Sequence, residues 1–414
     1  MINYTLAQYG YKQNSGYYVC MRKRVLLITI LVVLTILATV IALLVTNRAA
    51  GDNGRHQSNN TGHKTTPKVV ADGVETKIMF VGDVFWGRAV NRTAQASALK
   101  EAYPFSRLNE FRRENYDAWV GDLECPSVPG VNQPYAQEVE SLQFNCSSAY
   151  LPELAKWFTA VSLSNNHTSN QNGQSGLVAT RKALEDQKIQ YFGHYNPEVL
   201  GDVCEVMAIP ARMRMTDKSV RAIHVPVAMC GYHGLSTVPS AESLAVMKRY
   251  SAVMPVIAYP HMGTEYMATV DSVRRSLYRA MVDNGADAVM GGHPHWVQPS
   301  EVYKDKLIVY SMGNFLFDQG PGETRRGAAI SLTLSSKGDV PAESLSDWAA
   351  LGETCVMFRD DCLVQAEQKK LKRVDYTFAY TAQGLDISDR ATHPADAALN
   401  KSVLERLGWQ DLNY

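Results

Sequence analysis

The 414-residue chain has no excess of charge of either sign, because 41 lysines and arginines stand against 41 aspartates and glutamates. It also has no basic stripe interleaved with aromatic residues, the pattern by which many proteins contact nucleic acid. A phosphate-binding loop of the GxxxxGK(S/T) type is absent as well. The sequence therefore gives no reason to expect a nucleic-acid partner or a P-loop nucleotide site.

Charge is missing altogether from one long stretch, residues 25–46. As a helix this stretch would be about 33 Å long, enough to cross a hydrocarbon core of roughly 30 Å. A cleaved signal peptide is the alternative, but its apolar region is shorter and ends in small residues, whereas this one ends in Asn-Arg-Ala-Ala. We therefore predict an uncleaved transmembrane helix. Because Arg22, Lys23 and Arg24 precede it, residues 1–24 should stay in the cytoplasm and the remainder should be extracellular.

Apolar residues are scarce in the next stretch. Residues 47–75 are rich in asparagine, glycine, threonine, histidine and lysine, a composition that cannot bury enough apolar surface to fold. The segment is predicted to be a flexible linker between the membrane and the rest of the chain. His56 and His63 lie within it and are interpreted as solvated residues, not as metal ligands.

Cysteine pairs spaced as Cys-x-x-Cys are absent, which argues against a zinc ribbon. Cys20 precedes the predicted span and could be palmitoylated, although a bystander role is favoured. The remaining cysteines lie in the part expected to be exported, where disulfides form and persist. At least one disulfide is predicted there. Cys355 and Cys362 are the best pair because they are close in sequence, and Cys125 with Cys146 could close a longer loop.

Beyond residue 75 the chain carries short apolar runs, several of which alternate with helical patterns. Residues 175–187 and 267–284 have apolar side chains three and four apart, and Gly285 is a natural helix stop. Alternating strands and helices favour an α/β domain, expected over residues 76–336. In residues 337–414 the pattern weakens, and this C-terminal extension is given no role. The predicted strands are 77–81, 116–120, 159–163, 189–192, 222–230, 252–259, 286–290, 307–310 and 328–334.

The domain is organised around residues 285–319. A buried strand at 286–290 ends in two glycines and is followed by the motif that contains His293 and His295. Two imidazoles on a turn past the carboxyl end of a strand can point into one crevice, and α/β sheets bind ligands in such crevices. Chance could also place two histidines together. A second strand, 307–310, ends in another tight polar turn, which favours a metal site.

Polar side chains also follow four other predicted strands. Asp83 comes after the first, Glu124 after the second, Asn166 after the third and His261 after a later one. Each alone could be an ordinary turn residue. Together, carboxylate, amide and imidazole are the ligand types of a borderline divalent metal ion, with manganese, zinc and iron as the candidates.

The order of these motifs, GD, xLE, NNH, HxGxE and then GHPH with YSxGNFxFDQ, resembles the capsule-synthesis protein CapA family. The resemblance covers about residues 77–334, and its most specific part is GGHPHWVQPSE with YSMGNFLFDQ. Family members resemble calcineurin-like metallophosphoesterases, which implies a layered α/β/β/α sandwich. The resemblance also implies a membrane-anchored component of poly-γ-glutamate synthesis or export. Its partners would be the lipid bilayer, poly-γ-glutamate synthetase subunits and an anionic polymer.

The same resemblance implies roles for individual residues. His167 matches a general acid. Phosphoesterases have Asp-x-His at the first turn, whereas Phe85 stands in the place of that histidine here. The metal position that would use Asp83, Glu124 and His295 therefore lacks one imidazole. The other position, which would use the remaining ligands together with Glu124, should bind its ion more tightly. The implied metal ligands are Asp83, Glu124, Asn166, His261, His293 and His295.

Three further residues are candidates for substrate binding. Arg88 could grip a carboxylate or phosphate with two hydrogen bonds, or form a surface salt bridge. Glu265 could orient His261 or cap the following helix. Asn314 could line the crevice or hold the turn, and the turn is favoured. The histidines that fit no motif and are interpreted as structural are His194, His224 and His233.

Two functions from different classes follow. The favoured one is a capsule-assembly protein held at the cell membrane by a single span, whose extracellular domain binds an anionic poly-γ-glutamate chain or its carrier complex. The alternative is an exported metal-dependent hydrolase of a phosphoester or amide bond, in which a metal activates water and His167 donates a proton. The missing imidazole at position 85 speaks against a fully equipped two-metal hydrolase.

Overall fold

The structure is a computed structural model that describes residues 68–319, 322–357 and 361–412. Residues 68–414 belong to one compact unit. The predicted span at residues 25–46 and most of the predicted linker lie outside the described residues. Within the ranges that are described, no helix combines the length and the apolar character needed to cross a membrane.

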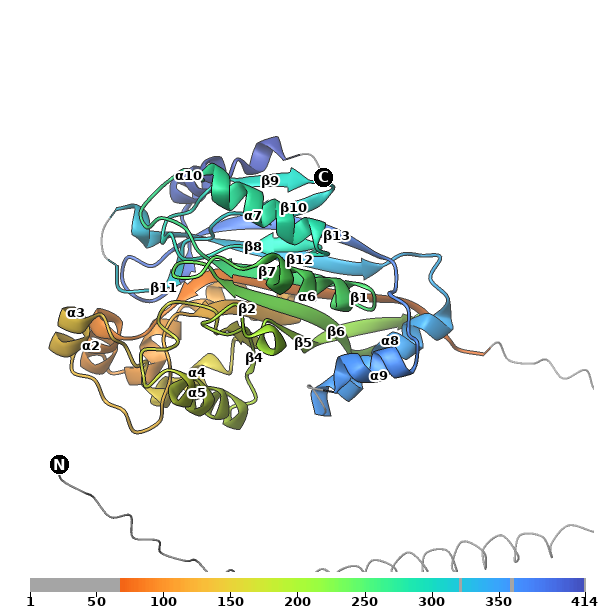
Figure 1. Cartoon of the computed structure of the whole chain (residues 1–414), viewed down its shortest axis with the longest axis horizontal. Helices are drawn as coiled ribbons and strands as arrows, with labels where there is room; N and C mark the ends of the chain where they lie inside the picture. The colour runs from red at the N-terminus through yellow and green to blue at the C-terminus, as the bar shows by residue number, and fades with distance from the viewer. Residues whose placement is uncertain (1–67, 320–321, 358–360, 413–414) are drawn as a thin grey trace, which may run out of the picture. The chain divides into compact units, whose positions relative to one another are not determined.

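One strand, β1 (Ala71–Val84), organises the mixed β-sheet seen in Figure 1. Its first residues pair antiparallel with β5 (Cys204–Met215), and its last residues pair parallel with β2 (Ala118–Leu123). On its other side it pairs antiparallel with β12 (Arg326–Ser336). The sheet therefore branches at β1. The fold is a mixed α/β fold dominated by strands.

In both branches, the strands that carry the functional side chains run in the same direction. The first branch continues from β2 to β3 (Ala160–Ser162) and β4 (Gln190–Phe192), all parallel. The second continues from β5 through β6 (Val220–His233), β7 (Val256–His261), β8 (Ala288–Met290) and β10 (Lys306–Val309) to β9 (Ser300–Tyr303). Because β1, β2, β3, β7 and β8 are parallel to one another, their carboxyl ends meet at one end of the sheet.

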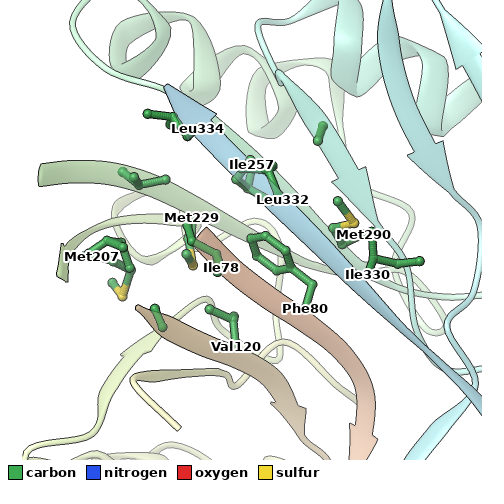
Figure 2. Packing of buried hydrophobic residues seen from close by; sticks show 14 of the residues in the cluster. Ile78, Phe80, Val120, Met207, Met229, Ile257, Met290, Ile330, Leu332 and Leu334 are labelled. Atoms are coloured by element: carbon green, nitrogen blue, oxygen red, sulfur yellow. The ribbon is translucent and has the colours of Figure 1, made fainter. Parts of the chain in front are cut away.

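From Ile78 onward both faces of β1 are buried, which explains why its apolar run is continuous there and does not alternate with polar residues. Ile78 and Phe80 belong to one apolar cluster, whereas Met79 and Val81 belong to another. Figure 2 shows the first cluster, where side chains from both branches of the sheet meet those of β12. Each such side chain contributes about 1.5–3 kcal/mol when fully buried. A slip of one residue in β1 would exchange the two clusters, so this packing fixes the register.

One predicted helix is confirmed almost residue for residue, and another is shorter than predicted. Helix α5 (Gln174–Asp186) follows the predicted pattern to within one residue. Helix α7 (Ser272–Asp283) begins five residues later than predicted, because Asp271 caps it by accepting a hydrogen bond from the Arg274 amide at 3.0 Å. Other helices, which the sequence did not predict, are α2 (Arg88–Ala96), α3 (Tyr135–Ser141), α4 (Leu151–Leu154) and α6 (Ala241–Ser251).

Residues 337–412, for which the sequence indicated no pattern, add further elements to the same unit. Strand β13 (Tyr376–Asp386) pairs with the whole length of β12, and the two-residue strand β14 (His393–Pro394) pairs with the end of β13. Leu399 and Val403 of α10 (Ala397–Leu407) pack into the cluster that contains Ile78 and Phe80. The other helices of this segment are α8 (Ala342–Met357) and α9 (Cys362–Gln368).

Three disulfides tie the unit together. Cys355–Cys362 joins α8 to α9, which confirms the predicted pair, and Cys125–Cys146, a pair the sequence left possible, closes the loop after β2. The third, Cys204–Cys230, joins residues that face each other across β5 and β6. The sequence did not predict this pair, because their contact depends on the register of two strands.

Candidate metal centre

Seven polar residues meet where β1, β2, β3, β7 and β8 end, and we refer to them as the ligand cluster. They are Asp83, Asp122, Glu124, Asn166, His261, His293 and His295. Six of these residues are at most 3% exposed, and Asn166 is half-buried. Burying carboxylates and imidazoles together is unfavourable unless each group has a partner, so the cluster calls for a hydrogen-bond network or a bound cation.

Four combinations of these and neighbouring residues place three ligand atoms within 4.8 Å of one another. Two of them contain the carboxylate and imidazole ligands of the two positions expected from the sequence. The other two bring in Asp122 and Glu265. The four groups are Asp83–Glu124–His295, Glu124–His261–His293, Asp83–Asp122–His261 and Glu265–His293–His295.

His261 is the meeting point of one group. Its Nε2 lies 2.9 Å from Asn166 Oδ1 and 3.2 Å from His293 Nδ1. Burial lowers the pKa of His261 to about 4, so the ring is neutral near pH 7, as a metal ligand must be. Three ligand-type atoms, from the end of β7 and from the loops after β3 and β8, therefore converge without a positive charge among them.

His295 is the corresponding residue of the other group. Its Nδ1 lies 2.9 Å from Asn314 Oδ1 and 3.2 Å from Asp83 Oδ2, and its Nε2 lies 3.9 Å from Glu124 Oε1. Because an amide oxygen can only accept, the bond to Asn314 places the proton on Nδ1 and leaves Nε2 free to bind a cation. Asn314 is fully buried and also donates to the Thr324 carbonyl at 3.0 Å, so it holds His295 and the turn.

Glu124 gives the sharpest test of whether the residues fit a metal. Both carboxylate oxygens are buried and have no hydrogen-bond partner among the described residues. Burial raises the pKa of Glu124 well above its usual range, and the nearby carboxylates of Asp83, Asp122 and Glu265 raise it further. A divalent cation would provide the missing partner for both oxygens, and the surrounding donor set fits one.

The turn after β8 is held in an unusual backbone conformation. His293 and His295 have backbone φ angles of 92° and 56°, values that residues other than glycine rarely adopt. The His293 amide donates to both oxygens of Asp83 at 3.3 Å. A Cβ atom at Gly292 would lie 2.6 Å from Asp83 Oδ1, so only glycine allows this approach. Strain of this kind is tolerated where it positions functional groups, here the two imidazoles.

Asp122 is a cluster residue that the sequence reasoning missed. Its Oδ2 lies 2.6 Å from His261 Nδ1, although not in line with the ring N–H, and its Oδ1 accepts from Asn165 at 3.0 Å. Burial raises the pKa of Asp122 to about 7. The sequence did contain a signal, because Asp122 and Glu124 are two apart and a strand turns such residues toward the same face.

His233 also adjoins the cluster, although it was interpreted as structural. Its ring centroid lies 6.4 Å from that of His261, with which it is in register across β6 and β7. Its Nδ1 donates to the Tyr195 carbonyl at 2.6 Å, whereas its Nε2 is buried without a hydrogen-bond partner in the described chain. No sequence motif indicated this position, which depends on strand pairing.

His167 lies at the edge of the cluster. Its Nε2 is 3.8 Å from Glu124 Oε1, its Nδ1 is 3.0 Å from Asn170 Oδ1, and its ring packs on Phe144 at a centroid distance of 4.4 Å. Burial lowers the pKa of His167 to about 3, so the ring is neutral at neutral pH. Because the amide oxygen of Asn170 can only accept, the proton lies on Nδ1, and Nε2 is positioned to accept a hydrogen bond beside Glu124.

Arg88 forms an ion pair, as one of the two interpretations expected. Its Nη2 lies 2.6 Å from Asp318 Oδ1, and its guanidinium lies 4.8–5.8 Å from the ring centroids of Phe85, Phe144 and Phe317. The side chain is 15% exposed, and its Nε is buried without a hydrogen-bond partner among the described residues. The guanidinium is thus held rigidly, with part of its donor capacity unused.

Glu265 is exposed on the loop between β7 and α7. Neither role considered from the sequence matches its surroundings. The cap of α7 is Asp271, and the carboxylates within 4 Å of the His261 ring are those of Asp83, Asp122 and Glu124. Its ligand-type neighbours are His293 and His295.

Comparisons with known proteins place these features in a family. The sequence profile of the family described as "Bacterial capsule synthesis protein PGA_cap" matches residues 77–209 and 211–319, which include the whole ligand cluster. The "PGA biosynthesis protein CapA" of Bacillus subtilis (strain 168) is 29% identical over 298 residues, covering 67% of this chain and 73% of that protein. The "Capsule biosynthesis protein CapA" of Bacillus anthracis is 27% identical over 267 residues, covering 62% of this chain and 64% of that protein.

A solved structure of a hypothetical protein from Thermus thermophilus covers 63% of this chain and 93% of its own, with 14% identity and a TM-score of 0.32, too low to carry an argument. The family match rests instead on sequence. It extends over more than half of the chain, from β1 to Gln319, just past β11 (Asn314–Leu316). The protein therefore belongs to the bacterial capsule synthesis protein family PGA_cap.

Proposed function

We propose that this protein takes part in the synthesis or export of a poly-γ-glutamate capsule. The observation that carries the proposal is the family match, which spans every residue of the ligand cluster, together with relatives named for PGA and capsule biosynthesis. Poly-γ-glutamate carries one carboxylate per residue. A domain that handles it needs local positive charge, because the chain as a whole has none in excess.

A divalent cation held by the ligand cluster is the proposed source of that charge. Glu124, Asn166, His261 and His293 would hold it most tightly, and the buried, unpartnered oxygens of Glu124 support this assignment. When bound, such an ion supplies a positive charge that pairs with carboxylate oxygens and can polarise a bound group. Arg88 is the second proposed contact for the polymer, because a rigid guanidinium suits a carboxylate.

The finer fold proposed is the layered α/β/β/α sandwich of metallophosphoesterases. Its support is the branching of the sheet at β1 and the separate apolar clusters on the two faces of that strand. An experimental structure in which β2, β3 and β4 continued the layer of β5 and β6 would contradict it.

Anchoring in the cell membrane is likewise a proposal, supported by the uncharged stretch at residues 25–46 and the basic residues before it. Protease added to spheroplasts should remove the domain and leave a short membrane-bound fragment. A fully protected domain would contradict the orientation, and a soluble processed form as the main species would contradict the anchor. Synthetase subunits are the proposed partners, and their failure to co-purify from detergent extracts would count against that proposal.

The capsule function is tested by replacing His293 with alanine in the chromosome. Surface polymer should be lost while the protein stays folded and membrane-bound, which immunoblotting of membrane fractions would verify. Replacement of His224, a histidine outside the ligand cluster, is the matched control and should leave the polymer unchanged. If deletion of the whole gene altered neither the amount nor the length of any surface polymer, the capsule assignment would be wrong.

A hydrolase that trims the polymer or cleaves a phosphoester is the second candidate, and the position of His167 beside Glu124 favours keeping it. In that case His167→Ala should leave polymer in place but increase its length, as gel filtration of released capsule would show. Loss of polymer without any change in the length of the remainder would favour assembly over trimming.

A further inference from the structure

The further inference concerns Glu265, which lies outside the ligand cluster but next to it. Its carboxylate groups with His293 and His295, with ligand atoms of all three within 4.8 Å of one another. Both imidazoles are almost fully buried, whereas Glu265 is exposed. An exposed glutamate alone would carry no argument. The second observation is Glu124, fully buried, whose unpartnered Oε1 lies 3.9 Å from His295 Nε2.

Backbone contacts hold the loop that carries Glu265 against the histidine turn. The Met262 amide donates to the Gly292 carbonyl at 3.3 Å, and the Tyr266 amide donates to the Pro294 carbonyl at 2.9 Å. The two bonds flank Glu265 in the sequence. These bonds fix the backbone of Glu265 beside the histidine turn, from where its carboxylate reaches both imidazoles.

The turn after β1 lacks an imidazole ligand, so a ligand from another loop can take its place. The position of the missing imidazole is occupied by Phe85, which is fully buried and stacks on Phe317 at a centroid distance of 4.8 Å. A phenyl ring offers no ligand atom. A cation on His295 would then have only Asp83 and Glu124 as further protein ligands from the cluster.

We propose that Glu265 supplies the additional ligand for a divalent cation bound at His295, in place of the imidazole that Phe85 cannot provide. The inference rests on the proposed cation centre and deepens it. Two of the ligand groups share His295, so an ion on this imidazole has Asp83, Glu124 and Glu265 as its candidate carboxylate ligands. The ion at His261 has four proposed ligands without Glu265, although Glu265 also groups with His293.

The ligand set also assigns a metal class. Three carboxylates and one imidazole form an oxygen-rich site, which suits manganese or magnesium better than zinc. The position at His261 offers two imidazoles, an amide and a carboxylate, which suits borderline metals such as zinc. The two positions are therefore expected to differ in the metal they prefer as well as in affinity.

The test is a metal titration of the full-length chain, purified in detergent and stripped with a chelator. Isothermal calorimetry with Mn²⁺, followed by electron paramagnetic resonance, would count the ions and measure each affinity. Glu265→Gln should weaken the weaker Mn²⁺ site at least ~10-fold, leave the tighter ion unchanged and leave the melting temperature of the metal-free protein unchanged. Glu265→Asp keeps the charge, so its affinity at the weaker Mn²⁺ site should lie between those of the wild type and Glu265→Gln.

Glu343→Gln is the matched control, because Glu343 is exposed at the start of α8 and belongs to none of the four groups. It should bind both ions as the wild type does. If Glu265→Gln bound both ions with wild-type affinity, only the proposed role of Glu265 would be overturned. A fall in the melting temperature of the metal-free variant large enough to account for the lost binding would have the same consequence. Absence of any bound ion in the folded wild type would overturn the cation centre itself.

Discussion

The two sides of the ligand cluster differ in what they offer a cation. The His261 side consists of Glu124, Asn166, His261 and His293, where His261 lies within 3.2 Å of both the amide oxygen and the second imidazole. The Asp83 side consists of Asp83, Glu124 and His295, where carboxylates outnumber imidazoles.

Phe85, two residues after Asp83, offers no ligand atom, whereas the His261 side has two imidazoles and an amide oxygen. Its ring is fully buried and stacks on Phe317 at a centroid distance of 4.8 Å. Nitrogen and amide ligands remain on the His261 side, so that side should keep the tighter ion. The predictions below test whether the two sides are separable, beginning with the largest expected effect.

Replacement of His261 by alanine should abolish the tighter ion, because His261 links Asn166 and His293 on that side. Elemental analysis of the full-length protein after incubation with manganese or zinc would measure the loss. His224→Ala is the control and should retain the metal. A His261→Ala protein with the full wild-type metal content would remove the basis for the comparison.

Replacement of Asp83 by asparagine should weaken the ion on the Asp83 side by at least ~10-fold and leave the tighter ion in place. Asparagine keeps one oxygen to accept the His293 amide, so the turn should persist. Calorimetric titration with Mn²⁺ would resolve the two sites. Equal weakening of both ions would mean that the two sides act as one unit.

Replacement of Asp122 by asparagine should reduce affinity on the His261 side by about 10–100-fold, the usual effect of removing the carboxylate that orients a metal-binding imidazole. The charge is lost while the shape of the side chain is kept. Competition with a fluorescent chelator would measure the change. An unaltered affinity would show that the 2.6 Å contact with His261 does not orient the ring.

Replacement of Glu124 by glutamine should have opposite effects on stability and on binding. The Glu124 carboxylate is buried without a partner among the described residues, and its raised pKa means that its charged form destabilises the metal-free folded state near neutral pH. The variant should therefore stabilise the metal-free protein by about 1–3 kcal/mol while weakening both ions. Chemical denaturation with and without metal would measure both effects. A destabilised metal-free variant would indicate that Glu124 has a structural partner.

Much of the fold could be predicted because several strands are short apolar runs with both faces buried. Residues 77–81 lie within β1, and residues 286–290 include the whole of the shorter strand β8. Strand β13 could not be predicted in the same way. Tyr376, Phe378 and Tyr380 do alternate with smaller residues, as in a half-buried strand, but where β13 lies depends on its pairing with β12.

The candidate ligands could be listed from the sequence, because carboxylate, amide and imidazole groups at strand ends are recognisable one at a time. Their grouping could not. The contact of Asp122 with His261 joins β2 to β7, and the approach of Glu265 to His295 depends on backbone bonds between two loops. Such distances are set by how strands far apart in the chain are ordered in one sheet.

The sequence by itself determined which groups are available: the apolar runs that become strands, the ligand types at their ends and a phenylalanine without a ligand atom two residues after Asp83. These are local properties, because burial pattern and side-chain chemistry are written within a few residues. Only the tertiary structure decided which groups meet, since a contact such as that between His233 and His261 requires the register of β6 against β7. That register is set by packing over the whole core and not by either strand alone.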